Sequence, residues 1–139
     1  MSPALFLRIA SILTLLYCAG HTSGAPWTVS DAPADMAVVA AMKSHAFNAL
    51  GSQRSLWDFY VGFGWTISAY LLLQAVLLWQ LGGLAKAGAP VRPAIVAILA
   101  FCLVNLALAW MFFFVLPIVL ITATAICLAA ALVVGPKRL

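Results

Sequence analysis

The chain has 139 residues, of which 66% are hydrophobic and 7% are charged. This composition excludes a soluble globular domain, which needs far more polar surface to cover its core. The formal net charge of +4 comes mostly from the ends of apolar segments, so we expect no nucleic-acid partner. The length predicts a single domain, and membrane lipid is its expected surroundings.

Four apolar segments follow one another along the chain, at residues 3–20, 57–81, 93–113 and 116–134. A helix needs about 20 apolar residues to cross the hydrocarbon core of a bilayer, so each segment predicts a transmembrane helix. The last two segments are joined without a charged residue, and as one straight helix they would be about twice as long as that core is thick. We therefore expect a tight hairpin around Phe112–Phe114, with Pro117 as the helix breaker.

The first segment leaves one alternative open. Arg8 precedes an apolar stretch, and Ser23-Gly24-Ala25 follows it as a set of small residues that suits a signal-peptide cleavage site. The apolar stretch is long for a signal peptide. We expect it to remain as the first span.

The connection between the first two spans contains a further helix signal. Ser30 or Asp31 can cap a helix that has Pro33 in its first turn. We expect this helix at about residues 32–50. Its side chains on one face are apolar apart from Lys43, and an amphipathic helix of this kind lies in the membrane interface or covers the bundle. The apolar members are Met36, Val39, Ala40, Phe47 and Leu50.

The distribution of basic residues predicts the orientation. Four spans place Lys43, Arg54 and all three acidic residues on one side of the membrane. The other side receives Arg8, Lys86, Arg92, Lys137 and Arg138. Because cytoplasmic loops are rich in Lys and Arg, both termini are predicted to be cytoplasmic. The expected fold is an all-α, four-helix transmembrane bundle in a bacterial inner membrane, with an extracytoplasmic interfacial helix between the first two spans.

Arg54 and Asp58 stand where the long apolar run of the second span begins. They are four residues apart, and they share one face of a helix if that helix starts before Arg54. One interpretation is an ion pair at the helix start, with Asp58 near the positive end of the helix dipole. The other is that Arg54 holds a lipid phosphate or the carboxylate of a ligand.

His21 follows the first span and is expected at a similar depth to Asp58. A hydrogen bond between them would orient the imidazole ring for general-base chemistry. The alternative is a histidine that lies in the headgroup region or bonds a loop carbonyl. The sequence shows no metal-ligand cluster, phosphate loop or nucleophile elbow, so no metal or cofactor is predicted.

Polar side chains at membrane depth should face other helices or a wet cavity. Tyr70 and Gln74 are two such residues in the second span, and Asn105 stands in the middle of the third. The amide of Asn105 needs a partner, which Tyr70 or Gln74 can supply. Interhelical packing is the structural interpretation of this set.

Two motifs carry a resemblance. They are His21-Thr-Ser-Gly24-Ala-Pro26-Trp27 and Arg54-Ser-Leu-Trp57-Asp58-Phe-Tyr60-Val-Gly62-Phe-Gly64. The chain resembles a family of small bacterial integral membrane proteins of unknown function over its first two spans and the loop between them. The resemblance implies a membrane location and no activity.

The candidate site is the extracytoplasmic mouth of the bundle. Three functional hypotheses follow: binding of a small hydrophobic or amphiphilic molecule, an accessory subunit that contacts a larger membrane complex or a second copy, and an isomerase or hydrolase acting on a lipid-like substrate. In the enzyme, His21 is the base and Asp58 orients it. The candidate residues are His21, Trp27, Arg54, Trp57, Asp58, Tyr60, Tyr70 and Asn105.

Overall fold

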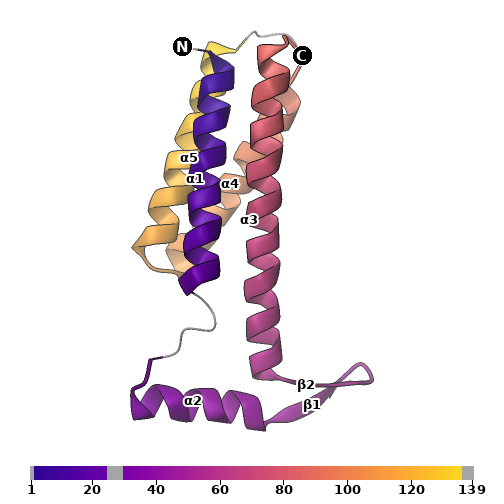
Figure 1. Cartoon of the computed structure of the whole chain (residues 1–139), viewed down its shortest axis with the longest axis vertical. Coiled ribbons are helices and arrows are strands. Elements are labelled where there is room, and N and C mark those ends of the chain that lie inside the picture. Colours follow the sequence, from indigo (N-terminus) through magenta and orange to yellow (C-terminus); the bar gives the residue numbers. More distant parts are fainter. Residues whose placement is uncertain (1, 25–29, 136–139) are drawn as a thin grey trace. The chain divides into compact units, whose positions relative to one another are not determined.

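The computed structural model describes residues 2–24 and 30–135, so the predicted site residue Trp27 lies outside the described residues. The elements are α1 (Pro3–Gly24), α2 (Pro33–Ser44), β1 (Ala46–Ala49), β2 (Ser52–Ser55), α3 (Leu56–Lys86), α4 (Arg92–Phe112) and α5 (Val115–Val134) (Figure 1). The chain forms two compact units. We call Met1–Cys18 with Leu71–Leu139 the bundle unit, and Ala19–Tyr70 the hairpin unit.

Four helices, α1, α3, α4 and α5, are long and apolar enough to cross a membrane. Their number and order confirm the prediction, and they indicate an integral membrane protein. Helix α3 has 31 residues, and at about 1.5 Å per residue it is roughly 46 Å long, well beyond a core of about 30 Å. It continues five residues past the predicted end, to Lys86. Gly88, with a φ of 79°, then reverses the chain, and the N–H of Ala89 donates to the carbonyl of Leu84 at 3.0 Å.

The predicted hairpin joins α4 to α5 within two residues. Phe113 and Phe114 have extended backbone, and α5 begins at Val115. The break therefore comes before Pro117, which lies in the first turn of α5. At that position the missing N–H of proline costs no helical hydrogen bond.

The bundle unit has a core of small and medium side chains, and small side chains let membrane helices approach closely. The hydroxyl of Ser11 donates to the carbonyl of Ala75 at 2.6 Å and so joins α1 to α3. Many large apolar side chains point outward instead, which suits lipid. The buried cluster consists of Leu7, Ala10, Leu78, Ile95, Cys102, Ala109, Ile121, Ala125, Leu128 and Ala131.

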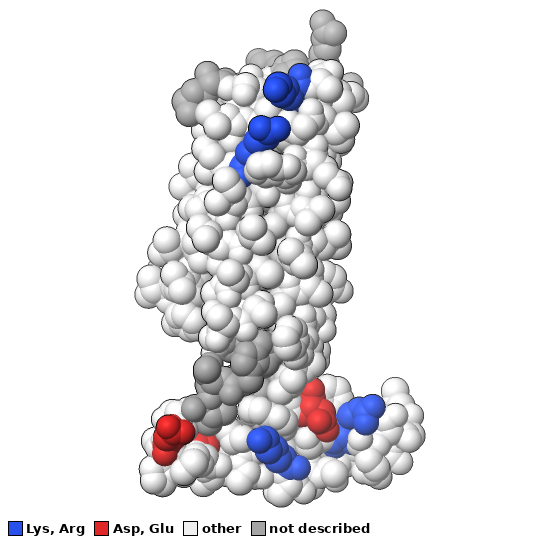
Figure 2. All heavy atoms as spheres, viewed as in Figure 1, with Lys and Arg blue, Asp and Glu red and all other residues white. Residues whose placement is uncertain are grey.

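The start of α1, the end of α3, the start of α4 and the end of α5 lie at one end of the bundle unit (Figure 1). Its described charged residues are all basic: Arg8, Lys86 and Arg92. Figure 2 shows basic side chains near that end and an uncharged surface over the rest of the visible face of this unit. A charge-free belt of this kind is what a bilayer core requires.

The hairpin unit corrects one prediction. Helix α2 ends at Ser44, and the predicted helix to about residue 50 is wrong, because β1 and β2 pair antiparallel from Ala46↔Ser55 to Ala49↔Ser52. Leu50 and Gly51 form the two-residue turn, with φ of 51° and 89°. Two positive φ values are typical of the hairpin turn whose twist matches that of the strands. The described part of the chain is therefore all-α apart from this hairpin. Ser30 does not cap the helix directly; its hydroxyl accepts from the N–H of Ala32, the N-cap residue, at 3.1 Å.

Candidate functional site

Helix α3 begins with a reciprocal cap between Ser55 and Asp58. The N–H and the hydroxyl of Ser55 donate to Oδ2 of Asp58 at 2.7 and 2.9 Å, and the N–H of Asp58 lies 3.2 Å from the Ser55 hydroxyl oxygen. This is a capping box, which satisfies N–H groups that the first turn of a helix leaves without partners. The Ser-x-x-Asp spacing before an apolar run is the sequence signal that predicts such a cap.

Arg54 belongs to β2, and α3 begins only at Leu56, so the condition for a shared helix face is not met. Its Nη1 donates to the carbonyl of Gln53 at 2.8 Å. Within the described residues, Arg54 and Asp58 form no ion pair, although their charges lie close enough to interact electrostatically; Oδ2 of Asp58 accepts from Ser55. A guanidinium has five N–H donors, so most of those of Arg54 remain open to a ligand.

Arg54 and Asp58 line an open groove of about 300 Å³, which we call the mouth groove. The rest of its lining is Phe59, Gly62, Phe63 and Thr66. A Cβ added at Gly62 would meet no atom within 4 Å, so the space beside this residue is open. The groove is therefore charged where Arg54 and Asp58 line it, and it is mostly apolar where it continues along the first turns of α3.

Aromatic contacts hold the wall of the mouth groove. The rings of Phe47 and Phe59 are stacked, with centroids 5.8 Å apart and planes 5° apart. Phe59 in turn contacts Phe63 at 6.2 Å between centroids. Since Phe47 lies in β1, the hairpin fixes the position of Phe59 on α3. Ring pairs at these distances stabilise one another beyond their buried area.

Trp57 and Tyr60, two predicted site residues, are not part of the groove lining. Their rings contact each other at 5.6 Å between centroids, and Nζ of Lys43 lies 4.7 Å from the Trp57 ring centroid. Lys43 belongs to the last turn of α2. This cation–π contact connects α2 to the start of α3, which is a structural role.

His21 contacts Ser68, not Asp58. Its Nδ1 lies 3.1 Å from the Ser68 hydroxyl, which also accepts from the hydroxyl of Thr22 at 2.9 Å. Ser68 follows Asp58 by ten residues, a rise of about 15 Å along α3. The predicted His–Asp pair is thus not formed, and Ser68 is only 6% exposed. Sequence reasoning missed Ser68 because a hydroxyl in an apolar run gives no signal of its partner.

The polar residues at membrane depth also find partners other than those predicted. The Asn105 amide donates to the carbonyl of Phe101, one turn earlier in α4, at 2.9 Å. The Gln74 amide lies 3.5 Å from the sulfur of Cys102 and joins α3 to α4. Asn105 and Gln74 are therefore not paired. Tyr70, in the hairpin unit, has a side chain that is 63% exposed.

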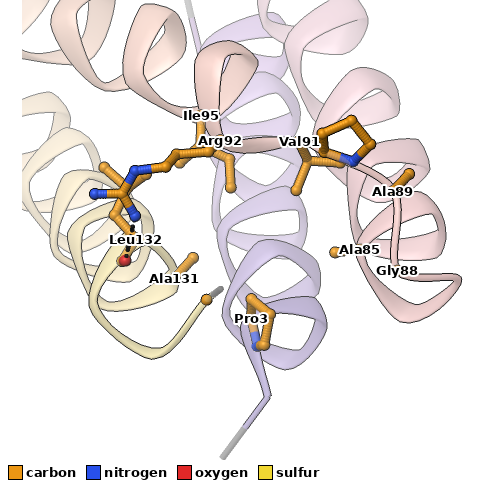
Figure 3. A pocket seen from close by; sticks show the side chains of 11 residues that line it. Pro3, Ala85, Gly88, Ala89, Val91, Arg92, Ile95, Ala131 and Leu132 are labelled. Carbon is orange, nitrogen blue, oxygen red and sulfur yellow. Dashed lines mark hydrogen bonds between the residues drawn. The ribbon is translucent and has the colours of Figure 1, made fainter. Parts of the chain in front are cut away.

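A second cavity, of about 320 Å³, lies where four helix ends of the bundle unit meet (Figure 3). The guanidinium of Arg92 turns to the carbonyl of Leu132 at 2.9 Å, an acceptor in the last turn of α5 that has no helical donor. Most of the remaining lining is small and apolar: Pro3, Ala85, Gly88, Ala89, Pro90, Val91, Ile95, Ala131 and Gly135. The sequence gives no sign of this cavity because its walls come from four separate segments.

Comparison with protein-family models, with curated proteins and with solved structures gives no match.

Proposed function

We propose that this integral membrane protein binds a small amphiphilic molecule in the mouth groove, on the extracytoplasmic side of a bacterial inner membrane. The observation that carries the proposal is the position of Arg54. Its guanidinium forms no ion pair among the described residues, and it lines the same groove as Asp58 and the apolar rings of Phe59 and Phe63. The resemblance to small bacterial membrane proteins and the positive-inside pattern support the location.

The head of the ligand carries a carboxylate or a phosphate in this proposal. Arg54 can hold either group with two parallel N–H donors. The apolar part of the ligand lies along Phe59 and Phe63, beside the open space at Gly62. A volume of about 300 Å³ is at the small end of ligand pockets, so the groove holds the head and the nearest part of the tail.

Two glycines of α3 allow a matched test. A Cβ at either Gly62 or Gly83 meets nothing within 4 Å, but only Gly62 lines the mouth groove. We expect Gly62→Leu to block binding of a fluorescent long-chain fatty acid by the purified protein, while Gly83→Leu binds it as the unaltered chain does. Equal binding by both variants would overturn the proposal.

The charge is tested in the same assay. Arg54→Gln removes the partner of the ligand head, and we expect binding about tenfold weaker, as for the loss of a charge-assisted hydrogen bond. Lys43→Gln makes the same change of charge in the hairpin unit, outside the groove lining. It should leave affinity within about twofold, since an exposed charge outside the groove lining contributes little. Equal effects of the two variants would mean that general charge, not the groove, attracts the ligand.

A partner subunit is the second candidate function, and the α4–α5 turn favours it. Trp110 is 76% exposed, and Met111, Phe112, Phe113 and Phe114 are each more than half exposed. A cluster of exposed apolar rings fits either the membrane interface or a protein partner. Native mass spectrometry after purification in mild detergent tests this function, because a stable partner or a second copy would add its mass to the chain.

The enzyme hypothesis is not retained. It requires Asp58 to orient His21, and these residues have different partners.

A further inference from the structure

We propose that the bundle unit holds an anionic phospholipid in a groove between α1 and α3, with the lipid phosphate on Arg8. This α1–α3 groove has a volume of about 270 Å³. Its lining residues are Ser11, Leu15, Leu72, Ala75, Val76, Trp79 and Gln80.

Arg8 lies beside this groove and forms no ion pair with a described residue. Its Cζ is 5.0 Å from the centroid of the Trp79 ring. Its Nε is enclosed and has no hydrogen-bond partner in the described part of the chain. A cation with an enclosed, unpaired N–H near the hydrocarbon region is costly. An anion bound at the remaining nitrogens would lower that cost.

Among the described residues of the bundle unit, no side chain supplies such an anion. The charged residues described there are Arg8, Lys86 and Arg92, and all are basic. Arg92 is already bonded to the carbonyl of Leu132, and Lys86 is exposed. Arg8 lies against Trp79, which lines the groove, and no described side chain of this unit can neutralise its charge.

The groove continues away from Arg8 along both helices. On α1 it follows Ser11 and Leu15, and on α3 it runs from Trp79 to Leu72. Seven residues of helix correspond to about 10 Å, which gives room for the first part of an acyl chain. The hydroxyl of Ser11 is bonded to Ala75, so it presents no unsatisfied donor to this chain.

A phospholipid matches both features of this site. Arginine binds phosphate with parallel donors, and tryptophan is enriched where the headgroups meet the hydrocarbon. Basic pockets between membrane helices bind anionic lipid heads. Free inorganic phosphate has the same head chemistry, but it would leave the apolar groove unused.

The headgroup is tested by native mass spectrometry of the full chain in mild detergent. Phosphatidylglycerol and phosphatidylcholine with identical acyl chains are added in turn. We expect about a fivefold preference for phosphatidylglycerol, the contribution of one basic residue near a membrane surface. Arg8→Gln should remove the preference, while Lys86→Gln, with the same change of charge, should keep it. Equal retention of both lipids, or a preference that survives Arg8→Gln, would overturn the proposal.

The acyl-chain groove is tested by a second pair. Val76→Trp fills the groove, while Val96→Trp places the same side chain on exposed α4 surface. We expect only Val76→Trp to lower phosphatidylglycerol retention. This comparison tests the groove even if the Arg8→Gln variant fails to fold. A large excess of inorganic phosphate should not displace the lipid. If phosphate displaces it and Val76→Trp binds as the unaltered chain does, the site belongs to a free anion and the lipid assignment is overturned.

Discussion

The backbone nitrogen of Ser55 lies 2.7 Å from Oδ2 of Asp58, at the point where β2 becomes α3. This contact changes the role of the acidic residue at the mouth of the membrane helix. Asp58 caps the helix and forms no ion pair with Arg54, and both side chains line the mouth groove.

Loss of the cap should weaken the start of α3. We expect Ser55→Ala or Asp58→Ala to lower the free energy of unfolding by about 1 kcal/mol, as for other helix caps. Asp35→Ala is the control, because Asp35 lies in the first turn of α2 without a side-chain cap and contributes mainly through the helix dipole, at most about 0.5 kcal/mol. Unfolding in mixed micelles, followed by circular dichroism, measures the difference, and equal losses would contradict the cap.

Arg54 and Asp58 should act independently on stability. Because they form no ion pair and their longer-range attraction is screened by water, the effects of Arg54→Gln and Asp58→Ala are expected to add within about 0.5 kcal/mol in a double-mutant cycle. A larger coupling energy would show that the two charges interact directly in the membrane.

The close approach of α1 to α3 predicts opposite results at two adjacent glycines. A Cβ at Gly82 would lie 3.2 Å from Cγ of Arg8 and 3.3 Å from the carbonyl oxygen of Ala4, whereas Gly83 faces open space. We expect Gly82→Leu to destabilise the bundle by about 1–3 kcal/mol through overpacking. Gly83→Leu should be neutral or stabilising, because leucine is the better helix former. Similar unfolding curves for the two variants would contradict this packing.

Arg92 should stabilise the end of α5. Arg92→Met removes a charged donor from the carbonyl of Leu132, and we expect a loss of about 1.5–3 kcal/mol in the free energy of unfolding. Lys86→Met removes an exposed charge from the same end of the bundle unit and should change stability by less than about 0.5 kcal/mol. Faster amide hydrogen exchange in the last turn of α5 would locate the effect, and an unchanged exchange rate there would count against it.

The four spans predict opposite exposure of two lysines. Lys43 follows one span and Lys86 follows two, so they should lie on different sides of the membrane. With cytoplasmic termini, a membrane-impermeant amine reagent should label Lys43 in intact cells and Lys86 only after lysis. Labelling of both lysines from one side would contradict the topology.

Sequence alone determined the features that depend on local composition. Apolar length gave the four spans, the charge-free joint predicted the α4–α5 turn, and the charges marked the mouth at Arg54 and Asp58. The Ser-x-x-Asp spacing also indicates the Ser55–Asp58 cap, because the two residues of a capping box lie only three positions apart in the chain. The hairpin also rests on a local contact, because Oδ1 of Asn48 accepts from the N–H of Gly51 at 2.7 Å. The helical spacing of the apolar residues around this turn concealed it in the sequence.

Only the tertiary structure decided which side chains meet across helices. Hydropathy sets how deep a residue lies but not how its helix is rotated or how neighbouring helices align. His21 and Asp58 could therefore be predicted near the same membrane surface, while about 15 Å along α3 separates Asp58 from Ser68, the residue that His21 contacts. The same reason hid the partner of Gln74, the α1–α3 groove beside Arg8 and the cavity at the four helix ends, since each is assembled from segments distant in the chain.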